Sequence, residues 1–450
     1  MVEKSALWEN MIHHLKEENL DEFRSYFFEL HPYDRAKFFL KLDQTDRMHV
    51  YHFLSPEEMA SVFENVKEDK KRLHMLLNEM DPAFAAKMFE HMNVDDAVDV
   101  LNELSKDQVA SYLAIMDVQV AKSIRELLNY EQFTAGSIMT TEFISIRANQ
   151  TVRSVMEKLR KEAPDAETIY YLYVTDEEKH LAGVLSLRDL IVHEDETIIA
   201  DIMKKNVYSV SVGDDQEEAA RKMKDYNFLA LPVVDFQNHL LGIVTVDDII
   251  DVLDEEASDD YSKLAAVSDV DSYDYNSISA ARKRLPWLII LLFLGMLTAS
   301  LIGRFEETLN KVAALALFIP LIAGMAGNTG TQSLAVAVRR LATEDGASEK
   351  VWKIVLKEAG TGVITGTVCG VVVALIIFVW KQELFLGLLV GISILATLTV
   401  ATIAGALIPL IMHRLHIDPA VASGPFITTI NDMISILIYF GMATMFMNYL

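Results

Sequence analysis

The chain has 450 residues, a formal net charge of −25 and one cysteine, Cys369. The charge is uneven, because residues 281–450 carry 12 Lys and Arg against 9 Asp and Glu, which leaves 28 against 56 for residues 1–280. So acidic a half argues against nucleic acid and anionic lipid surfaces as its partners, since both recruit basic proteins. A single cysteine excludes an internal disulfide and a cysteine-based metal site, and the length suits about three domains.

Residues 1–130 are dense in apolar patterns of helical period. Several of these patterns open on a capping residue followed by proline, as Ser55 before Pro56 and Asp81 before Pro82, and proline suits the first helical turn. Short helices of similar spacing predict an all-α stack of helical hairpins, a superhelix. The first residues contain no apolar signal region, so we expect the N-terminus to stay in the cytosol.

Three acids, Asp95, Asp96 and Asp99, fall on one predicted helix of this first domain. Asp95 and Asp99 are four residues apart and share a face, where like charges are mildly destabilising. A counter-cation would relieve that repulsion, so the three are candidate ligands. The alternative is a solvated acidic face without a ligand.

Residues 137–262 contain an internal repeat in which short β-branched runs alternate with a helical pattern. Each copy ends in glycine, two apolar residues, Ser or Thr, two more residues and Asp, at Gly183–Asp189 and Gly242–Asp248. A strand that leads into a helix capped by Ser186 or Thr245 presents backbone N–H groups at the helix N-terminus. That arrangement suits an anionic group such as phosphate.

The repeat closely resembles a tandem pair of CBS domains, here 137–199 and 200–253, each an α/β unit. The resemblance implies a site for ATP or another adenine nucleotide. Its candidate residues here are Arg188 and Asp189, with Asp248 as a weaker counterpart in the second copy. The alternative is a CBS pair that binds no nucleotide.

An acidic segment, 254–285, connects the repeat to the apolar half and is predicted to be helical at its start. Acids at three- and four-residue steps share one side of such a helix and repel one another. They are Asp248, Asp251, Glu255 and Asp259, with Glu256 and Asp260 adjoining. Hard divalent cations with oxygen ligands would neutralise them, although the spacing is not that of an EF-hand. The alternative is a solvated linker helix.

The last part, 286–450, is predicted to be an α-helical transmembrane domain of five helices, because each apolar segment reaches the roughly 20 residues that cross a bilayer. The predicted spans are 286–303, 312–338, 354–380, 384–412 and 422–448. Basic residues gather before the first span, between the second and third, and between the fourth and fifth. The positive-inside rule then places the N-terminal half in the cytosol and the C-terminus outside.

The second span contains PLIAGMAGNTGTQS, which runs from Pro320 to Ser333. Glycines at three-residue spacing allow close backbone approach, and the amides and hydroxyls beside them supply uncharged oxygens. Gly327, Asn328 and Thr329 are therefore candidates to line an ion pathway. The alternative is a helix–helix contact through small residues.

One acid, Asp432, lies inside the fifth span, where a carboxylate costs about 2.5 kcal/mol or more. It should face protein or a watery path, and we interpret it as the charged ligand of a cation pathway. Gly424 and Pro425 predict a local break that frees backbone carbonyls, with Thr428 nearby. Such a pore suits hydrated Mg²⁺, which gives up its waters reluctantly. The alternative is a structural acid paired with Lys or Arg.

The acidic helical domain, the CBS pair, the acidic linker helix, the glycine-rich motif and the final span with Pro and Asp together resemble the MgtE magnesium channel and transporter family. This resemblance covers the whole chain. It implies a homodimer in the lipid bilayer of the cell membrane, with a pore at the subunit interface that binds the ion at Asp432. It also implies that cytosolic Mg²⁺ closes the pore by binding at Asp95, Asp96, Asp99, Glu217, Asp248, Asp251, Glu256, Asp259 and Asp260.

Two features depart from the family pattern. Asn227 stands where a family acid can bind the ion, and Gly424 and Thr428 stand where relatives can carry Asn and Ala. Two alternatives to Mg²⁺ uptake stay open: a membrane-anchored CBS sensor of nucleotides or ions that transports nothing, and a CBS-regulated exporter of divalent cations. The sequence has no Ser/His/Asp or Cys/His arrangement and no P-loop, so we do not expect an enzyme.

Overall fold

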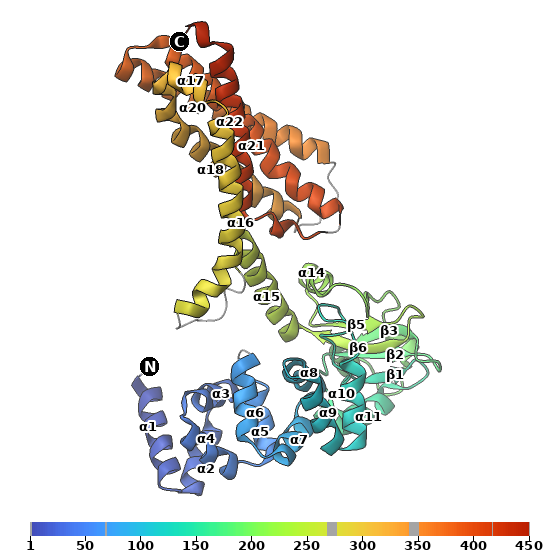
Figure 1. Ribbon diagram of the computed structural model, residues 1–450. Helices are drawn as coiled ribbons and strands as arrows, with labels where there is room; N and C mark the ends of the chain where they lie inside the picture. Colours follow the sequence, from blue (N-terminus) through green and yellow to red (C-terminus); the bar gives the residue numbers. More distant parts are fainter. Residues whose placement is uncertain (1, 68–69, 268–276, 342–350, 416, 450) are drawn as a thin grey trace. The chain divides into compact units, whose positions relative to one another are not determined.

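The computed structural model describes residues 2–67, 70–267, 277–341, 351–415 and 417–449. The chain forms two compact units, Met1–Asp254 and Glu255–Leu450, and each is described by itself (Figure 1). Unit 1 holds the acidic helices and the repeat. Unit 2 holds most of the acidic linker and the apolar helices.

Short antiparallel helices build the start of unit 1. Their bounds are α1 Val2–Lys16, α2 Leu20–Glu29, α3 Pro32–Lys41, α4 Gln44–Phe53, α5 Pro56–Phe63, α6 Lys70–Glu79, α7 Pro82–His91, α8 Val94–Asn102, α9 Lys106–Ile115 and α10 Val118–Leu127. The predicted caps are confirmed: Ser55 forms a capping box with Glu58, and the Asp81 side chain accepts hydrogen bonds from the first turn of α7. One continuous apolar core joins these helices.

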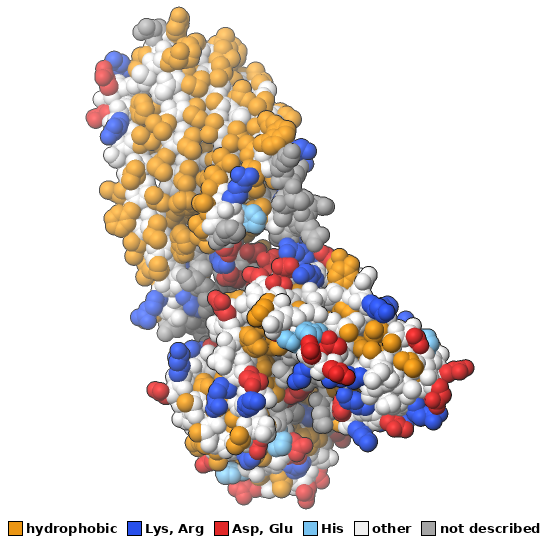
Figure 2. All heavy atoms as spheres, turned by 90° about the vertical axis from the view of Figure 1, so that its right-hand side faces the viewer, with side chains coloured by type: hydrophobic (Ala, Val, Ile, Leu, Met, Phe, Trp, Pro, Cys, Tyr) orange, Lys and Arg blue, Asp and Glu red, His pale blue; other side chains and the backbone are white. Residues whose placement is uncertain are grey.

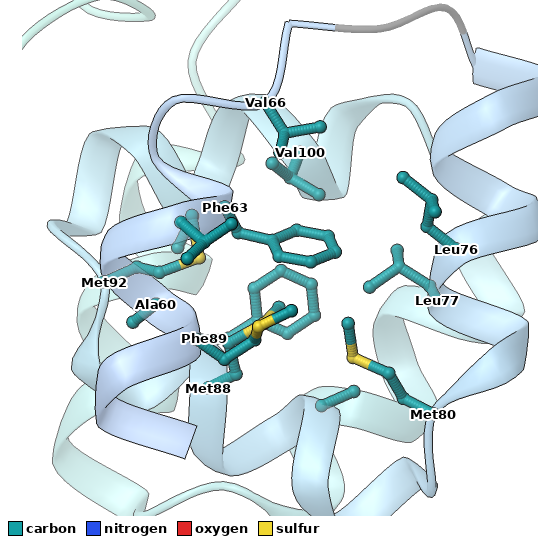
Figure 3. Packing of buried hydrophobic residues seen from close by; sticks show 14 of the residues in the cluster. Ala60, Phe63, Val66, Leu76, Leu77, Met80, Met88, Phe89, Met92 and Val100 are labelled. Carbon is teal, nitrogen blue, oxygen red and sulfur yellow. The ribbon is translucent and has the colours of Figure 1, made fainter. Parts of the chain in front are cut away.

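Figure 3 shows part of that core, where the rings of Phe63 and Phe89 lie at the centre of the cluster. Leu77 of α6 and Met80, which directly follows α6, approach them from one side, and both phenylalanines are at most 1 % exposed. The same packing holds the C-terminal end of α5 beside α8. Acidic side chains at these two places are thereby fixed near one another.

The repeat folds into two matching three-stranded sheets, as the sequence predicts. The first has β1 Ser145–Arg147, β2 Tyr171–Thr175 and β3 Leu181–Ser186, with helices α11 Val152–Glu162, α12 Leu187–Val192 and α13 Ile199–Ile202. The second has β4 Val210–Ser211, β5 Ala230–Val234 and β6 Leu240–Thr245, with α14 Gln216–Tyr226. In each sheet the first pair of strands is parallel and the second antiparallel.

The repeated glycines have a packing reason. A Cβ on Gly183 would lie 2.8 Å from the sulfur of Met203, and a Cβ on Gly242 would lie 2.8 Å from the sulfur of Met139. At each glycine, a methionine-bearing segment from the other copy lies alongside the last strand of the sheet. A larger side chain there would push the segment away from the sheet.

Helix α15, Val246–Ala265, starts directly after β6 and contains the first part of the acidic linker, 254–265. Its first residues therefore belong to the CBS repeat, and the helix ends well before residue 285. Residues 268–276 of the predicted linker lie outside the described residues. The next helix, α16, begins at Ser277 and contains Pro286, so it extends the first span beyond its predicted start.

Five helices of unit 2 are long and apolar enough to cross a membrane, as predicted, among the residues the structure describes. They are α16 Ser277–Gly303, the segment Ala313–Leu341 with α18 Ile319–Leu341, α20 Val351–Lys381, α21 Leu384–Arg414 and α22 Gly424–Met445. The short α17, Glu306–Lys311, joins the first two. Hydrophobic side chains cover most of the face of unit 2 that Figure 2 shows, as a lipid-facing surface requires.

Glycines let these helices pack closely. On α20, Gly362, Gly366 and Gly370 face the backbone of α21 so tightly that a Cβ would overlap it. This is the small-residue contact that replaces large apolar packing inside membranes. Helix α21 in turn packs against α18 and α22, which carry the residues of the predicted ion pathway.

Candidate functional site

Helices α18 and α22 meet at Asp432. A Cβ placed on Gly327 would lie 3.2 Å from the Cβ of Thr428 and 3.7 Å from Oδ1 of Asp432. The missing side chain of Gly327 therefore makes room for both residues. Three predicted pathway residues come together here, and none of the ion pairs among the described residues includes Asp432.

Asn431 is a second polar group at this contact, which the sequence analysis did not select. It is 1 % exposed, and neither its side-chain nitrogen nor its oxygen has a hydrogen-bond partner in the described part of the chain. Its amide fills the space beside Gly330, where any Cβ would overlap Nδ2. A buried amide without partners is uncommon and calls for a functional or structural explanation.

The predicted break at Pro425 is wrong. Gly424 is the first residue of α22, Ser423 precedes it as the N-cap, and Pro425 lies in the first turn, where its missing N–H leaves no bond unmade. The Pro425 carbonyl accepts hydrogen bonds from Thr428 Oγ1 and Thr429 Oγ1, both at 2.8 Å. Proline therefore starts this helix instead of interrupting it.

The other motif residues are placed differently around α18. Thr329 is half-buried and its hydroxyl donates to the carbonyl of Met325 at 2.8 Å, so it is satisfied within its own helix. Asn328 is exposed. Gly424 lies near Thr331, with 3.4 Å from its notional Cβ to Thr331 Cγ2.

A second acid of unit 2 was also missed. Glu358 of α20 is 9 % exposed, and Ser333 at the end of the glycine-rich motif donates to its Oε2 at 2.9 Å. The same hydroxyl lies 2.8 Å from the carbonyl oxygen of Thr402 on α21. Ser333 thus links three spans. The sequence signal for this contact was a serine at the end of the glycine-rich motif together with an acid on the following span.

The end of α15 packs within unit 2. Lys263 forms ion pairs with Asp259 on its own helix and with Asp418, which lies before α22. Leu264 contacts the apolar cluster formed by α18 and α22. Burial and the nearby Asp418 raise the pKa of Asp260 despite Lys263. The predicted acids at 259 and 260 therefore lie close to the start of α22.

Unit 1 contains a cavity of about 150 Å³ lined mainly by acids. Five predicted residues reach it, Asp95, Asp96 and Asp99 from α8 together with Asp248 and Asp251 from α15. Two further lining residues, Glu64 at the end of α5 and the basic Lys67, were not predicted. We call this group of seven residues the acidic cavity. Glu217 is exposed at the start of α14 and does not line it.

The carboxyl groups of the acidic cavity repel one another. Burial, followed by the charges of Asp95, Glu64 and Asp248, raises the pKa of Asp96 to about 9. Burial also raises the pKa of Asp95 to about 7, with Glu167 contributing, and that of Asp248 to about 7, with Asp95 contributing. Oδ1 of Asp95 is buried without a hydrogen-bond partner among the described residues. The interior of the cavity, around Asp95, therefore lacks a countercharge although Lys67 lies in its lining.

The described residues contain no group of three or more His, Cys, Asp or Glu arranged to hold a metal ion directly. The acidic cavity is therefore not a closed inner-sphere site in this arrangement. An ion that keeps its waters would suit such a cavity, because water can bridge it to carboxylates that are too far apart to bind it directly.

A second cavity, of about 260 Å³, lies in the CBS pair. Its lining includes Tyr208, Phe228, Lys204 and Asp189, that is, aromatic side chains, one cation and one carboxylate. The carboxylate of Asp189 accepts hydrogen bonds from the backbone N–H and the hydroxyl of Ser186 in a capping box. Arg188 is exposed and lies outside the lining.

Asn227 ends helix α14 in the left-handed conformation, with φ 53° and ψ 44°. Asparagine adopts this conformation more readily than most residues other than glycine. Asn227 thus has a local structural role at the end of α14.

Three family models match the chain. They are described as "Divalent cation transporter" for residues 319–442, "MgtE intracellular N domain" for 30–132 and "CBS domain" for 135–195 and 199–255. Together with the five candidate spans, these matches define the class: a membrane transporter that carries an N-terminal helical domain and a CBS pair, not an enzyme.

Curated relatives match along the whole chain. "Magnesium transporter MgtE" of Enterococcus faecalis is 54% identical over 100% of this chain and 98% of its own length. The protein of the same name from Bacillus subtilis is 40% identical, over 97% and 96%. That of Thermus thermophilus is 36% identical, over 87% and 92%. The chain belongs to the MgtE family of magnesium transporters.

Two solved structures resemble the soluble part. "Crystal structure of the soluble part of a magnesium transporter" is 53% identical with a TM-score of 0.55, and covers 56% of this chain and 99% of that one. "Crystal structure of the cytosolic domain of the Mg2+ channel MgtE in complex with ATP" is 38% identical with a TM-score of 0.50, over 53% and 97%. The predicted fold class is confirmed.

Proposed function

We propose that this protein is a Mg²⁺-selective channel or transporter that mediates magnesium uptake across the cell membrane. The observation that carries this proposal is Asp432, an acid inside a membrane-spanning helix, half-buried against Gly327 and outside every ion pair found among the described residues. An intramembrane carboxylate without a countercharge is expected at an ion pathway.

The surroundings of Asp432 suit a hydrated ion. Neutral oxygens from Thr428 and from the backbone of α22 lie on the same part of the helix, and Gly327 keeps α18 close without adding bulk. Mg²⁺ holds its waters tightly, so oxygens that contact the hydration shell can select it while one carboxylate supplies charge. Asn328 and Thr329 of α18 and Gly424 at the start of α22 complete the proposed lining.

The proposed assembly is a homodimer with the pore at the subunit interface. Asn328 is exposed in the single chain, as a residue that faces a partner subunit would be. In the proposed orientation the N-terminal domains lie in the cytosol and the C-terminus outside, which the basic residues between the spans support through the positive-inside rule.

Cytosolic Mg²⁺ closes the pore in this proposal. The acidic cavity supplies the first ligands, which are Asp95, Asp96, Asp99, Asp248 and Asp251. Burial and neighbouring carboxylates raise the pKa values of Asp95, Asp96 and Asp248, as expected where countercharge is missing. Glu256, Asp259 and Asp260 on α15 and Glu217 on α14 are the further proposed ligands. A bound ion shifts the gate only by its preference for the closed form.

An adenine nucleotide is a second proposed ligand, in the CBS cavity. Tyr208 and Phe228 offer rings for the base, Lys204 a charge for phosphate, and Asp189 a carboxylate for the ribose. The relative crystallised with ATP supports this assignment. Binding there would stiffen the CBS pair and so bias the same gate.

The test is Mg²⁺ flux into proteoliposomes that contain the purified full chain, for the wild type and for Asp432→Ala. We expect the substitution to lower flux about 100-fold or more, because it removes the only charge in the proposed lining. Asp432→Glu, which keeps the charge, should retain part of the flux. Equal flux in wild type and Asp432→Ala would move the pathway elsewhere, and no flux in a folded wild type would favour the non-transporting sensor.

A further inference from the structure

One basic side chain, that of Lys67, lies in the lining of the acidic cavity where Mg²⁺ is proposed to bind. Lys67 follows the end of α5 and lines the cavity together with six carboxylate side chains. Its ammonium forms an ion pair with Asp251 of α15. Among the described residues, it is the one basic side chain that lines this cavity.

The ion pair of Lys67 is easily broken. The Lys67 side chain is 69% exposed and that of Asp251 is 59% exposed. Ion pairs this exposed contribute little to stability, since water screens the charges and the long lysine side chain loses freedom when it is held. Lys67 can therefore leave the cavity without unfolding either helix.

The interior of the cavity still lacks a countercharge while Lys67 is in place. Oδ1 of Asp95 is buried and unpartnered in the described part of the chain, and Asp95 and Asp96 lie deeper than the exposed Asp251. A single ammonium at the rim neutralises one charge of a cluster that formally carries six. A divalent cation would place more charge nearer the buried acids.

We propose that Lys67 is a tethered competitor of the regulatory cation and thereby sets the Mg²⁺ concentration at which the acidic cavity fills. Without Mg²⁺ the ammonium partly offsets the repulsion between α8 and α15. When Mg²⁺ enters, it repels the ammonium, which swings into solvent on its exposed side. This inference rests on the proposed regulatory function of the cavity.

The test measures Mg²⁺ titrations of Lys67→Gln, Lys67→Arg and wild type as full-length protein. Two readouts are followed, the thermal stability of the purified protein and flux in proteoliposomes. Removing one positive charge a few ångströms from a divalent ion should lower both Mg²⁺ midpoints about three- to tenfold. Lys67→Arg keeps the charge and should restore the wild-type midpoints.

Lys122→Gln is the matched control, because Lys122 is a similarly exposed lysine whose ion pair, with Glu126 on α10, lies outside the cavity lining. It removes the same net charge and should leave both midpoints unchanged. A Lys67→Gln midpoint equal to wild type, or a shift that Lys122→Gln reproduces, would overturn the inference. A stability midpoint that shifts while wild-type flux ignores Mg²⁺ would support the inference and contradict the proposed closure of the pore.

Discussion

The acidic cavity of unit 1 and the contact between α18 and α22 in unit 2 both contain carboxylates that lack a full countercharge, but they are built differently. The cavity has six acids, and burial together with neighbouring carboxylates raises the pKa values of Asp95, Asp96 and Asp248. The membrane contact has one acid, Asp432, beside glycine, threonine and an unpartnered amide. Many coupled acids suit reversible sensing, whereas one acid among neutral oxygens suits passage without tight binding.

The contact between α18 and α22 depends on glycines of α18, so a substitution that adds a methyl group at these positions should disrupt it. Gly330→Ala places a Cβ onto Nδ2 of buried Asn431, and we expect a loss of about 1–3 kcal/mol of stability together with loss of flux. Thermal unfolding and flux of the full chain measure both.

Gly324→Ala is the matched control within the same motif, because nothing lies within 4 Å of its notional Cβ. Gly327→Ala should fall between the two, since its 3.2 Å contact with Thr428 requires only a small shift. Equal tolerance at all three positions would mean that α18 and α22 are not packed as described.

The cavity should instead respond to pH. The acids have raised pKa values in the folded state, about 7 for Asp95 and Asp248 and about 9 for Asp96, against about 3.9 when unfolded. The folded state then binds more protons, so its stability is highest at low pH and is lost as pH rises through these values. Without Mg²⁺, we expect unfolding at lower temperature at pH 9 than at pH 6.

Asp96→Asn removes the most perturbed of these groups and should flatten that pH dependence, by an amount on the order of a few kcal/mol at pH 9. Saturating Mg²⁺ should flatten it in the wild type as well. A stability that rises from pH 6 to pH 9 in Mg²⁺-free wild type would contradict the repulsion assigned to the cavity.

Much of the fold, and part of both candidate sites, could be predicted from the sequence. Periodicity and proline-preceding caps predict the short helices, the repeat predicts two like sheets, and apolar length predicts five spans, since each depends on local pattern. Asp95, Asp96, Asp99, Asp248 and Asp251 were selected from helical spacing and the family resemblance, and all five reach one cavity. Five negatively charged side chains on neighbouring helical faces were enough to predict a bound cation.

The residues that were missed depend on tertiary contact. Glu64 and Lys67 reach the cavity only because α5 packs beside α8, and Glu358 meets Ser333 only because α18 and α20 approach each other. Pro425 was misread because proline at the first turn of a helix and proline within a helix look alike until the N-cap is located. Arg188 and Glu217 are predicted from the resemblance alone, and neither lines a cavity described above.

The smallest expected effect concerns Asn227, which tests whether this position is structural or ligates the ion. Asn227→Gly should leave stability within about 0.5 kcal/mol of wild type, and Asn227→Ala should lose about 1 kcal/mol, because of the left-handed conformation. Asn227→Asp restores the family acid. If Asn227→Asp lowers the Mg²⁺ concentration at which the pore is half closed, the position is part of a regulatory site. An unchanged concentration would mean that Asn227 only caps the helix.

In the proposed function the acidic cavity senses cytosolic Mg²⁺, whereas Asp432 lies on the ion pathway. The most direct test of these separate roles neutralises the acids of the cavity. Mg²⁺ flux in proteoliposomes would be measured for wild type and for Asp95→Asn/Asp96→Asn/Asp248→Asn, with Mg²⁺ varied on the cytosolic face. We predict that wild-type flux falls as cytosolic-side Mg²⁺ rises, while the triple variant conducts at all concentrations. A triple variant that closes at the wild-type concentration, or that no longer conducts although it is folded, would contradict the account.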